Sequence, residues 1–331
     1  MQPSSAIYRY DLSLTIDEFG DHMNRAGFIG SRVLPLLPVA HESASFSRVK
    51  IASVLTPMED TRRAEDGTYN RATFEWDQET YKTEEHGLEE VLDNRRVKVY
   101  GNEIKAEQIA RRRLLNRLLQ KYEYDAAAAV FDTATWTGSD LTTAVSTAWS
   151  AASGSTPVAD IIAAAKKVRL NCGFRPNALV MTWDALVALK NNSEILDRVK
   201  YSGMDDPKNI SRAALCELFE IEEIIVADAV KNTAGRGQAT ATLAGIWDDT
   251  KAMLCHIDTS SDLESVVPGI GRTFVWNEDS YTSNSADGTI GCLVEEYRED
   301  ASRGTVLRAR NERKIKILHP EAGHLLTGIT A

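Results

Sequence analysis

The sequence lacks long apolar runs and has few cysteines. No apolar stretch approaches the roughly 20 residues that a membrane-spanning helix needs, and residues 1–11 have no apolar core of the kind found in secretion signals. The four cysteines, Cys172, Cys216, Cys255 and Cys292, include no CxxC pair, which argues against a zinc clamp or a compact disulfide framework. We therefore expect free thiols and a protein that folds in a cytoplasm and has no membrane partner.

Cationic residues are fewer than acidic ones. Lys and Arg number 38 against 48 Asp and Glu, so the formal net charge is −10. Affinity for nucleic acid comes from neutralising phosphates with cations, so this balance argues against a sequence-specific DNA-binding protein. It remains compatible with a protein that encloses DNA without adhering to it. The hydrophobic fraction of 43% and the length of 331 residues predict a folded chain with two domains or one elaborate domain.

Catalytic and metal-binding motifs are missing as well. Cys255 and His256 are adjacent in a predicted strand, so their side chains point to opposite faces and cannot act as a nucleophile–base pair. His319 and His324 are separated by a proline and a glycine, which break any helix that would bring them together on one face. The Gly-Ile-Gly at 269–271 lacks the remainder of a phosphate loop. We expect no catalytic residue, cofactor or metal site.

An apolar segment rich in proline lies near the N-terminus. Residues 33–39 read Val-Leu-Pro-Leu-Leu-Pro-Val, and the two prolines fix φ and remove backbone donors. Such a segment is extended and cannot be a helix or a central strand. It must bury its apolar side chains either on its own domain or on a neighbouring subunit. The second alternative makes Leu34, Pro35, Leu37 and Pro38 candidate intersubunit contacts.

Two alternating stretches flank a charged one and predict a long hairpin. Residues 46–54 and 72–82 alternate as strands do, and residues 57–71 between them are polar and contain a glycine. An isolated two-stranded ribbon has only marginal stability, so we expect this one to rest on another surface.

Four side chains of this hairpin are candidate intersubunit contacts. Phe74 and Trp76 share one face of the second strand, and large aromatic residues often anchor buried interfaces. Arg62 and Arg63 belong to the charged tip, where polar contacts set register and partner choice.

The rest of the chain predicts a long helix, an α/β region and a pair of long strands. Helical spacing from Asn102, a predicted N-cap, to about residue 131 gives few large apolar residues in its first half. A helix from Pro157 to Gly173 follows, with Val158, Ile161, Ile162, Ala165 and Val168 as its predicted buried stripe. Strands are expected at 178–181, 223–227, 243–247, 252–257, 291–299 and 305–318.

These segments, in this order, resemble the major capsid proteins of tailed bacteriophages, which have the Hong Kong 97 fold. The most specific stretches are Gly-Phe-Arg-Pro-Asn-Ala-Leu-Val-Met at 173–181, Trp-Asp-Ala-Leu at 183–186 and Ile-Leu-Asp-Arg-Val-Lys-Tyr-Ser at 195–202. The resemblance implies an α+β fold with the following parts: an N-terminal arm at 1–45, an E-loop hairpin at 46–97, the spine helix of the P-domain at 98–140, an α/β A-domain at 141–261, P-domain strands at 262–312 and C-terminal closing strands at 313–331.

The resemblance also implies a function. A major capsid protein of this family self-assembles as hexamers and pentamers into an icosahedral shell that encloses double-stranded DNA, which it contacts non-specifically. It would be located in the virion, and in the host cytoplasm before assembly. The arm begins almost at once, so we expect either a separate scaffolding protein or a propeptide that has been removed, besides a portal and a decoration protein. Lys50 and Lys82 lie on the hairpin, but no asparagine acceptor for a covalent cross-link can be assigned.

Two alternatives remain at this stage. An encapsulin-like cellular nanocompartment has a shell of the same fold, which would hold an enzyme cargo in place of a genome. A cytosolic α/β enzyme would instead require a pocket with convergent titratable groups.

Overall fold

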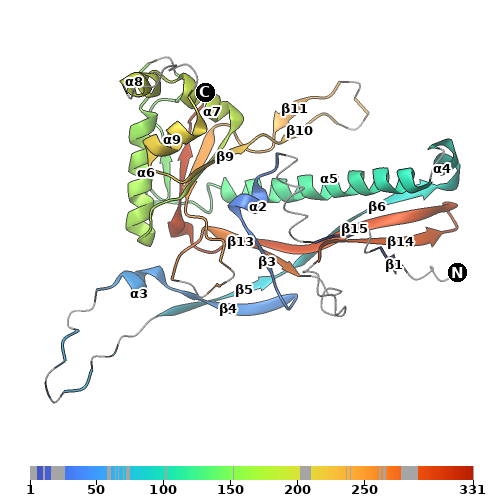
Figure 1. The fold of residues 1–331 in the computed structure, drawn as a ribbon, viewed down its shortest axis with the longest axis horizontal. Coiled ribbons are helices and arrows are strands. Elements are labelled where there is room, and N and C mark those ends of the chain that lie inside the picture. The colour runs from blue at the N-terminus through green and yellow to red at the C-terminus, as the bar shows by residue number, and fades with distance from the viewer. Residues whose placement is uncertain are drawn as a thin grey trace.

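The computed structural model describes most of the chain, and helices and strands lie throughout it (Figure 1). Within these residues, no helix combines the length and the apolar composition that crossing a membrane requires. The described residues are 6–9, 12–15, 27–57, 61–63, 65, 67–69, 71, 75–100, 103–151, 153–201, 210–235, 237–238, 240–260, 262–263, 266–276 and 290–330.

An α/β unit is built on a five-stranded sheet in the order β7-β16-β12-β8-β9. β8 is buried along its whole length, as its continuous apolar run predicts, and it pairs in parallel with β9. The strands are β7 (Thr142–Ala144), β8 (Ala178–Thr182), β9 (Glu223–Ala227), β12 (Lys251–Cys255) and β16 (Gly323–Thr327). The helices are α6 (Pro157–Cys172), α7 (Trp183–Asn191), α8 (Ser193–Tyr201) and α9 (Arg212–Phe219), and the 3-10 turn η1 (Pro320–Ala322) precedes β16.

The main helix of this unit, α6, ends where the sequence predicts. Gly173 caps it in the left-handed conformation, with φ of 83°. Its buried stripe, however, runs through Ala164 instead of Ala165, and Ile162 is 38% exposed. The periodicity therefore predicted the helix correctly, but the predicted buried face is rotated toward Ile162 relative to the observed one.

A seven-stranded sheet forms the elongated part of the molecule (Figure 1). Its longest strand, β15, pairs with β14, with β6 and, through its second half, with β13. The strands are β1 (Ile7–Tyr8), β2 (Leu14–Thr15), β3 (Leu36–Pro38), β6 (Glu84–Asp93), β13 (Gly271–Trp276), β14 (Ile290–Glu299) and β15 (Gly304–Ile317). The range 46–97 placed β6 with the hairpin, whereas β6 is hydrogen-bonded to β15 and belongs to this sheet.

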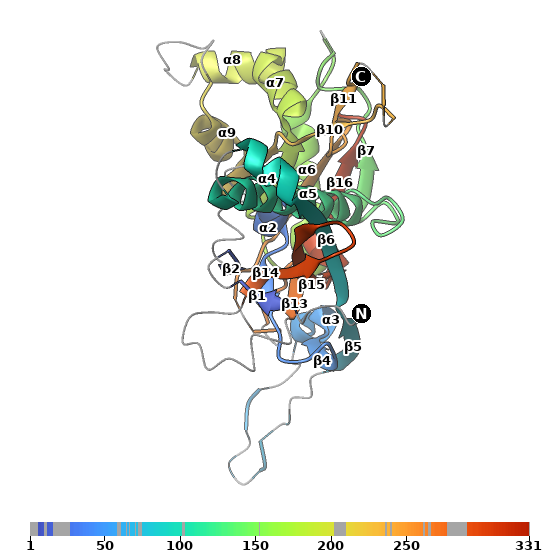
Figure 2. The same ribbon diagram turned by 90° about the vertical axis from the view of Figure 1, so that its right-hand side faces the viewer.

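The long helix α5 (Glu103–Val130) lies along this sheet, preceded by the short helix α4 (Asn94–Tyr100), as Figures 1 and 2 show. Its first half was expected to bury little, but it buries Ala106, Ala110 and Leu114. Small side chains let the helix approach the sheet closely, and they are weak signals in an apolar pattern. The predicted N-cap, Asn102, lies outside the described residues.

The proline-rich segment lies on its own subunit. After the short helix α2 (Gly30–Val33), β3 pairs in parallel with β13 at the edge of the large sheet. Leu34 is fully buried and Leu37 is 7% exposed, which corrects the expectation that these two side chains contact a neighbouring subunit. Val33 and Leu34 pack with the C-terminal part of α5, and Leu37 and Val39 pack with Tyr81 and Phe274, so the apolar side chains of this segment are buried within the monomer. Pro35 is half-buried and Pro38 is exposed.

Candidate assembly surface

The hairpin consists of β4 (Ser43–Val49) and β5 (Trp76–Lys82), which pair in antiparallel register from Ser43 opposite Lys82 to Val49 opposite Trp76. It projects from the body, and the described residues of the segment that joins its strands extend farther still (Figure 1). The strand predicted at 46–54 ends at Val49, because the residues that follow form the short helix α3 (Ile51–Leu55). Ile51 packs against the buried end of α6, an environment that the local alternation does not reveal.

Three aromatic rings attach the base of the hairpin to the large sheet. Tyr81 of β5 stacks on Phe274 of β13, and Phe46 of β4 lies 5.6 Å from Phe274 and 6.3 Å from Tyr81 between ring centroids. Phe274 is fully buried. Stacked aromatic pairs contribute beyond their buried area, so this group fixes where the ribbon leaves the body.

Charged side chains surround the aromatic group. Arg48 of β4 pairs with Glu79 at 3.1 Å and donates a hydrogen bond to the carbonyl of Leu318. Lys316 of β15 lies 2.6 Å from Glu79. Glu79 therefore bridges a cation of the hairpin and a cation of the sheet.

A buried histidine lies beside this network. His319 is 7% exposed, and burial together with the nearby Arg48 lowers its pKa to about 4. The imidazole is therefore neutral at neutral pH. His324, which the sequence places close by, is held elsewhere, by Thr143 Oγ1 at 2.9 Å and by the carbonyl of Asp140 at 2.8 Å.

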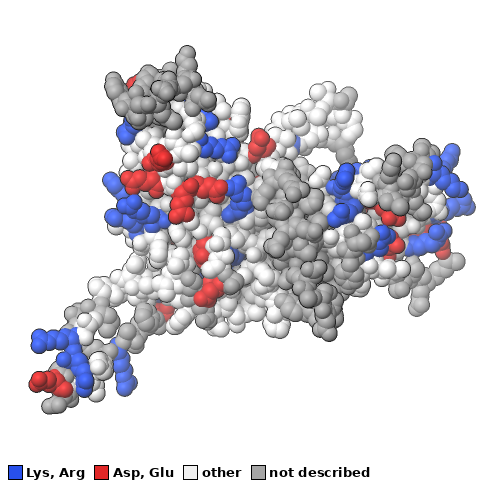
Figure 3. Space-filling model, in the orientation of Figure 1, with Lys and Arg blue, Asp and Glu red and all other residues white. Residues whose placement is uncertain are grey.

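The far end of the hairpin is polar and exposed. Arg62 and Arg63 are both exposed, and the guanidinium of Arg63 lies 4.9 Å from the ring centroid of Tyr69. Charges of both signs mark this end in Figure 3. Trp76 is 52% exposed, so a large aromatic surface stands open at the point where the ribbon ends. Phe74, the other predicted aromatic contact, lies outside the described residues.

The cysteines and histidines form no reactive group in the part of the chain described. All four cysteines are free thiols, as expected, and burial raises the pKa of Cys255 and of Cys292 to about 12. Thiols with such pKa values carry almost no thiolate at neutral pH and are poor nucleophiles. No three His, Cys, Asp or Glu side chains of the described ranges lie where they could share a metal ion.

The sequence patterns did not predict the buried acid Glu123. Glu123 of α5 is fully buried and accepts hydrogen bonds from the backbone N–H of Ile29 and Gly30, each at 2.9 Å, and from Trp247 Nε1 at 2.6 Å. Burial raises the pKa of Glu123, and the three hydrogen bonds oppose that rise. Its only signal in the sequence is an acid on the apolar face of a helix. The carboxylate fastens the arm to α5.

Comparisons with known proteins show which fold this is. No protein-family model and no curated protein sequence matches the chain. A crystal structure of a phage-related protein from Bordetella bronchiseptica RB50 matches with a TM-score of 0.68 and 20% identity, over 96% of this chain and 98% of that one. The capsid of the cyanophage P-SCSP1u gives a TM-score of 0.53 and 11% identity, over 89% and 86%. A virus-like particle from Pyrococcus furiosus gives a TM-score of 0.52 and 14% identity, over 93% and 95%. The chain therefore has the Hong Kong 97-like α+β fold of phage capsid proteins.

Proposed function

We propose that this chain is the major capsid protein of a tailed bacteriophage, which self-assembles as hexamers and pentamers into an icosahedral shell around double-stranded DNA. The observation that carries the proposal is the capsid fold along nearly the whole chain, combined with a hairpin that extends beyond the subunit body. A monomeric protein gains nothing from an exposed ribbon that ends in an aromatic side chain, whereas a shell subunit uses such a ribbon to reach its neighbour.

In this proposal each part of the fold has a role in the shell. The β4–β5 hairpin and its tip are the E-loop, α5 is the spine helix of the P-domain, the seven-stranded sheet supplies the P-domain strands, and the α/β unit is the A-domain. Arg62, Arg63, Trp76 and the exposed Pro38 are the candidate contacts with neighbouring subunits, and Phe74 is proposed with them because it precedes Trp76 by two residues in the sequence.

The proposed partners are further copies of the chain, a separate scaffolding protein, a portal, a decoration protein and the packaged DNA. The net charge of −10 supports a non-specific relation to DNA, because a lumen that repels phosphates lets the genome be packaged without adhering. Subunits would be present in the host cytoplasm before assembly and in the virion afterwards.

A cellular nanocompartment shell is the second candidate function. The fold alone does not separate it from a phage capsid, because a virus-like particle from Pyrococcus furiosus matches this chain at nearly the same TM-score as the cyanophage capsid. Particles produced in the native host distinguish the two functions. Nuclease-protected DNA of genome length supports the phage capsid, and an enzyme cargo without DNA supports the nanocompartment.

Negative-stain electron microscopy of the concentrated protein tests the proposed shell. We expect capsomers, tubes or closed particles that increase with protein concentration. A species that stays monomeric at every concentration and salt tested, with its hairpin protected from proteolysis, would overturn the proposal.

A further inference from the structure

One flank of the α/β unit is both apolar and cationic. On α6, Leu170 is 71% exposed and Ile162 is 38% exposed, although both are large aliphatic residues. Lys166 and Arg169 lie between them on the same side of the helix, since residues three and four apart share a face. Neither cation has an acidic partner among the described residues. We call these four residues the α6 flank.

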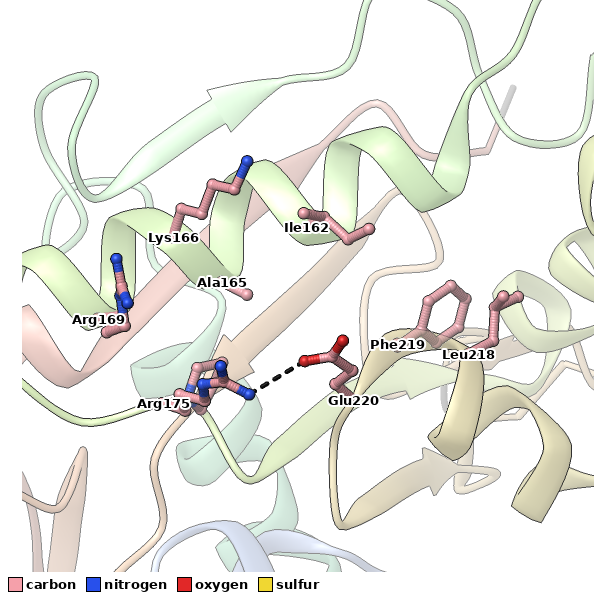
Figure 4. A pocket seen from close by; sticks show the side chains of 9 residues that line it. Ile162, Ala165, Lys166, Arg169, Arg175, Leu218, Phe219 and Glu220 are labelled. Atoms are coloured by element: carbon pink, nitrogen blue, oxygen red, sulfur yellow. Dashed lines mark hydrogen bonds and ion pairs between the residues drawn. The ribbon is translucent and has the colours of Figure 1, made fainter.

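A pocket of about 280 Å³ deepens this flank between α6 and α9. Its apolar lining includes Ile162 and Ala165 of α6 and Leu218 of α9, which Figure 4 shows on the two sides of the pocket. Glu220 is the one carboxylate among the lining residues, and it is paired with Arg175 at 3.0 Å. The flank is therefore complementary to an occupant that has aliphatic side chains and a free acid.

Such a surface exists on another part of the same chain, the small hairpin of β10 (Val230–Asn232) and β11 (Leu243–Gly245). Asn232 pairs opposite Leu243, so Val230 and Leu243 lie on the same face of the ribbon. Lys231, on the other face, lies 5.2 Å from the ring centroid of Tyr124 in α5. The apolar face therefore points away from the subunit, and Val230 is 56% and Leu243 66% exposed.

An acid accompanies this apolar face. Asp228 is exposed two residues before Val230, and it has no cationic partner among the described residues. We call Asp228, Val230 and Leu243 the hairpin face. Its composition, two aliphatic side chains and one carboxylate, complements that of the α6 flank.

The two surfaces lie on opposite sides of the α/β unit. In Figure 1, α6 is at the left edge and the β10–β11 hairpin extends to the right, and in Figure 2 the hairpin lies on the side nearer the viewer. A ring of identical subunits needs two different, complementary surfaces of this kind, because each subunit contacts one neighbour with one surface and the other neighbour with the second.

We infer that the hairpin face of one copy packs against the α6 flank of the next copy around a ring. Val230 and Leu243 cover the aliphatic side chains of the flank, and Asp228 faces Lys166 and Arg169. Two copies of this acidic chain repel each other on average. At this contact opposite charges face each other, so the two copies attract. The inference rests on the proposed shell function and assigns the contact that closes its rings.

Disulfide trapping tests the contact directly. In a Cys216→Ser background, Leu170→Cys and Leu243→Cys are combined in one chain, and the assembled protein is treated with oxidised glutathione. Non-reducing electrophoresis is expected to show a ladder of linked chains that stops at the ring size, a pentamer or a hexamer. Either cysteine alone is the first control. The pair Leu170→Cys with Val266→Cys is the second, because Val266 is also exposed, at 54%, but lies outside the proposed contact.

A charge exchange gives an independent readout. Asp228→Lys and the double variant Lys166→Glu/Arg169→Glu are each expected to lower particle yield about tenfold, and the triple variant is expected to restore it, because the attraction is rebuilt with the signs reversed. Particles that form normally but show no ladder above the Val266 control, and no rescue, would overturn this contact while leaving the shell intact. A parent protein that never assembles would instead overturn the proposed function, and the contact with it.

Discussion

The ring of Tyr81 on the hairpin lies parallel to the ring of Phe274 in the large sheet, with centroids 4.5 Å apart and planes inclined by 4°. This stack joins two segments almost 200 residues apart in the chain. The orientation of the hairpin relative to the body thus depends on this stack, on the neighbouring ring of Phe46 and on the ion pairs around Glu79.

Removing the buried ring should loosen the hairpin base. Phe274→Ala is expected to lower the free energy of unfolding by about 3–5 kcal/mol, the usual cost of deleting a buried aromatic side chain. Tyr81→Phe is the matched control. It keeps the stack and loses only the hydroxyl, which donates to the carbonyl of His41 at 3.2 Å, so it should cost about 1 kcal/mol. Denaturant unfolding and hydrogen exchange of β4 and β5 measure both effects, and equal costs for the two variants would contradict a stack that holds the hairpin.

The buried His319 should make stability depend on pH. Its pKa is about 4 in the folded protein against an ordinary value of 6.5, so between these values the unfolded chain binds a proton that the native chain does not. The stabilisation is complete above about pH 6.5 and is lost as the pH falls to about 4, by about 3 kcal/mol in total. His319→Gln should flatten this acid limb in denaturant titrations at stepped pH. An unchanged slope would show that His319 does not titrate in this window.

The arm should detach when its buried acceptor is removed. Glu123→Ala leaves three buried donors without their partner, and we expect a loss of about 3–5 kcal/mol. Glu123→Gln keeps one acceptor oxygen and should cost less. Limited proteolysis reports the arm separately, with faster cleavage in residues 27–38 of the alanine variant. Wild-type protection there would mean that the β3–β13 pairing alone holds the arm.

Glu123 should also make the free energy of unfolding depend on pH, with a slope opposite in sign to that of His319. Burial raises the pKa of Glu123, so the native state retains a proton that the unfolded chain loses, and this contribution to stability falls as the pH rises through that range. Glu123→Gln removes this slope, which separates the two groups in the same titration.

The tip of the large hairpin should serve assembly and not folding. Replacing residues 57–71 by a short Gly-Ser linker leaves the β4–β5 pairing and the buried residues of α6 intact, so thermal unfolding of the α/β unit should change little. Particle yield should fall to background. Shells of normal size from this variant would remove the tip from the assembly contacts, and failure to fold would place it in the subunit's own core.

Assembled particles should be held together without covalent links. Lys50 pairs with Glu75 at 2.9 Å and Lys82 lies 3.9 Å from Glu42, so both hairpin lysines have acidic neighbours within the subunit. Boiling in detergent should release chains near 36.6 kDa. A ladder that survives reductant would show a cross-link and contradict this expectation.

Local sequence patterns were sufficient to predict elements whose apolar spacing and end signals are clear. The helix that ends at Gly173 and the strand from Ala178 follow from spacing and capping alone, and the resemblance to capsid proteins came from the order of such elements. The fold class was therefore predictable, and the structural neighbours confirm it.

Features that depend on distant contacts could not be predicted in this way. Ile51, in α3, packs against the C-terminal end of α6. Leu34 is buried because it packs against residues near the C-terminal end of α5. The three donors to Glu123 lie 93, 94 and 124 residues away in the sequence. The candidate contacts at Arg62, Arg63 and Trp76 are exposed, but whether a neighbour covers them is a property of the assembly.

The long strand β15 has a mechanical consequence. Hydrogen bonds run from it to β14, β6 and β13, and Lys316 near its end reaches the hairpin base. A pull between the hairpin and the far end of the sheet is thus directed along one continuous strand. Tension in that direction shears many ladder bonds at once and does not unzip them one by one. The subunit should therefore be stiff along its length and yield first where the hairpin leaves the sheet.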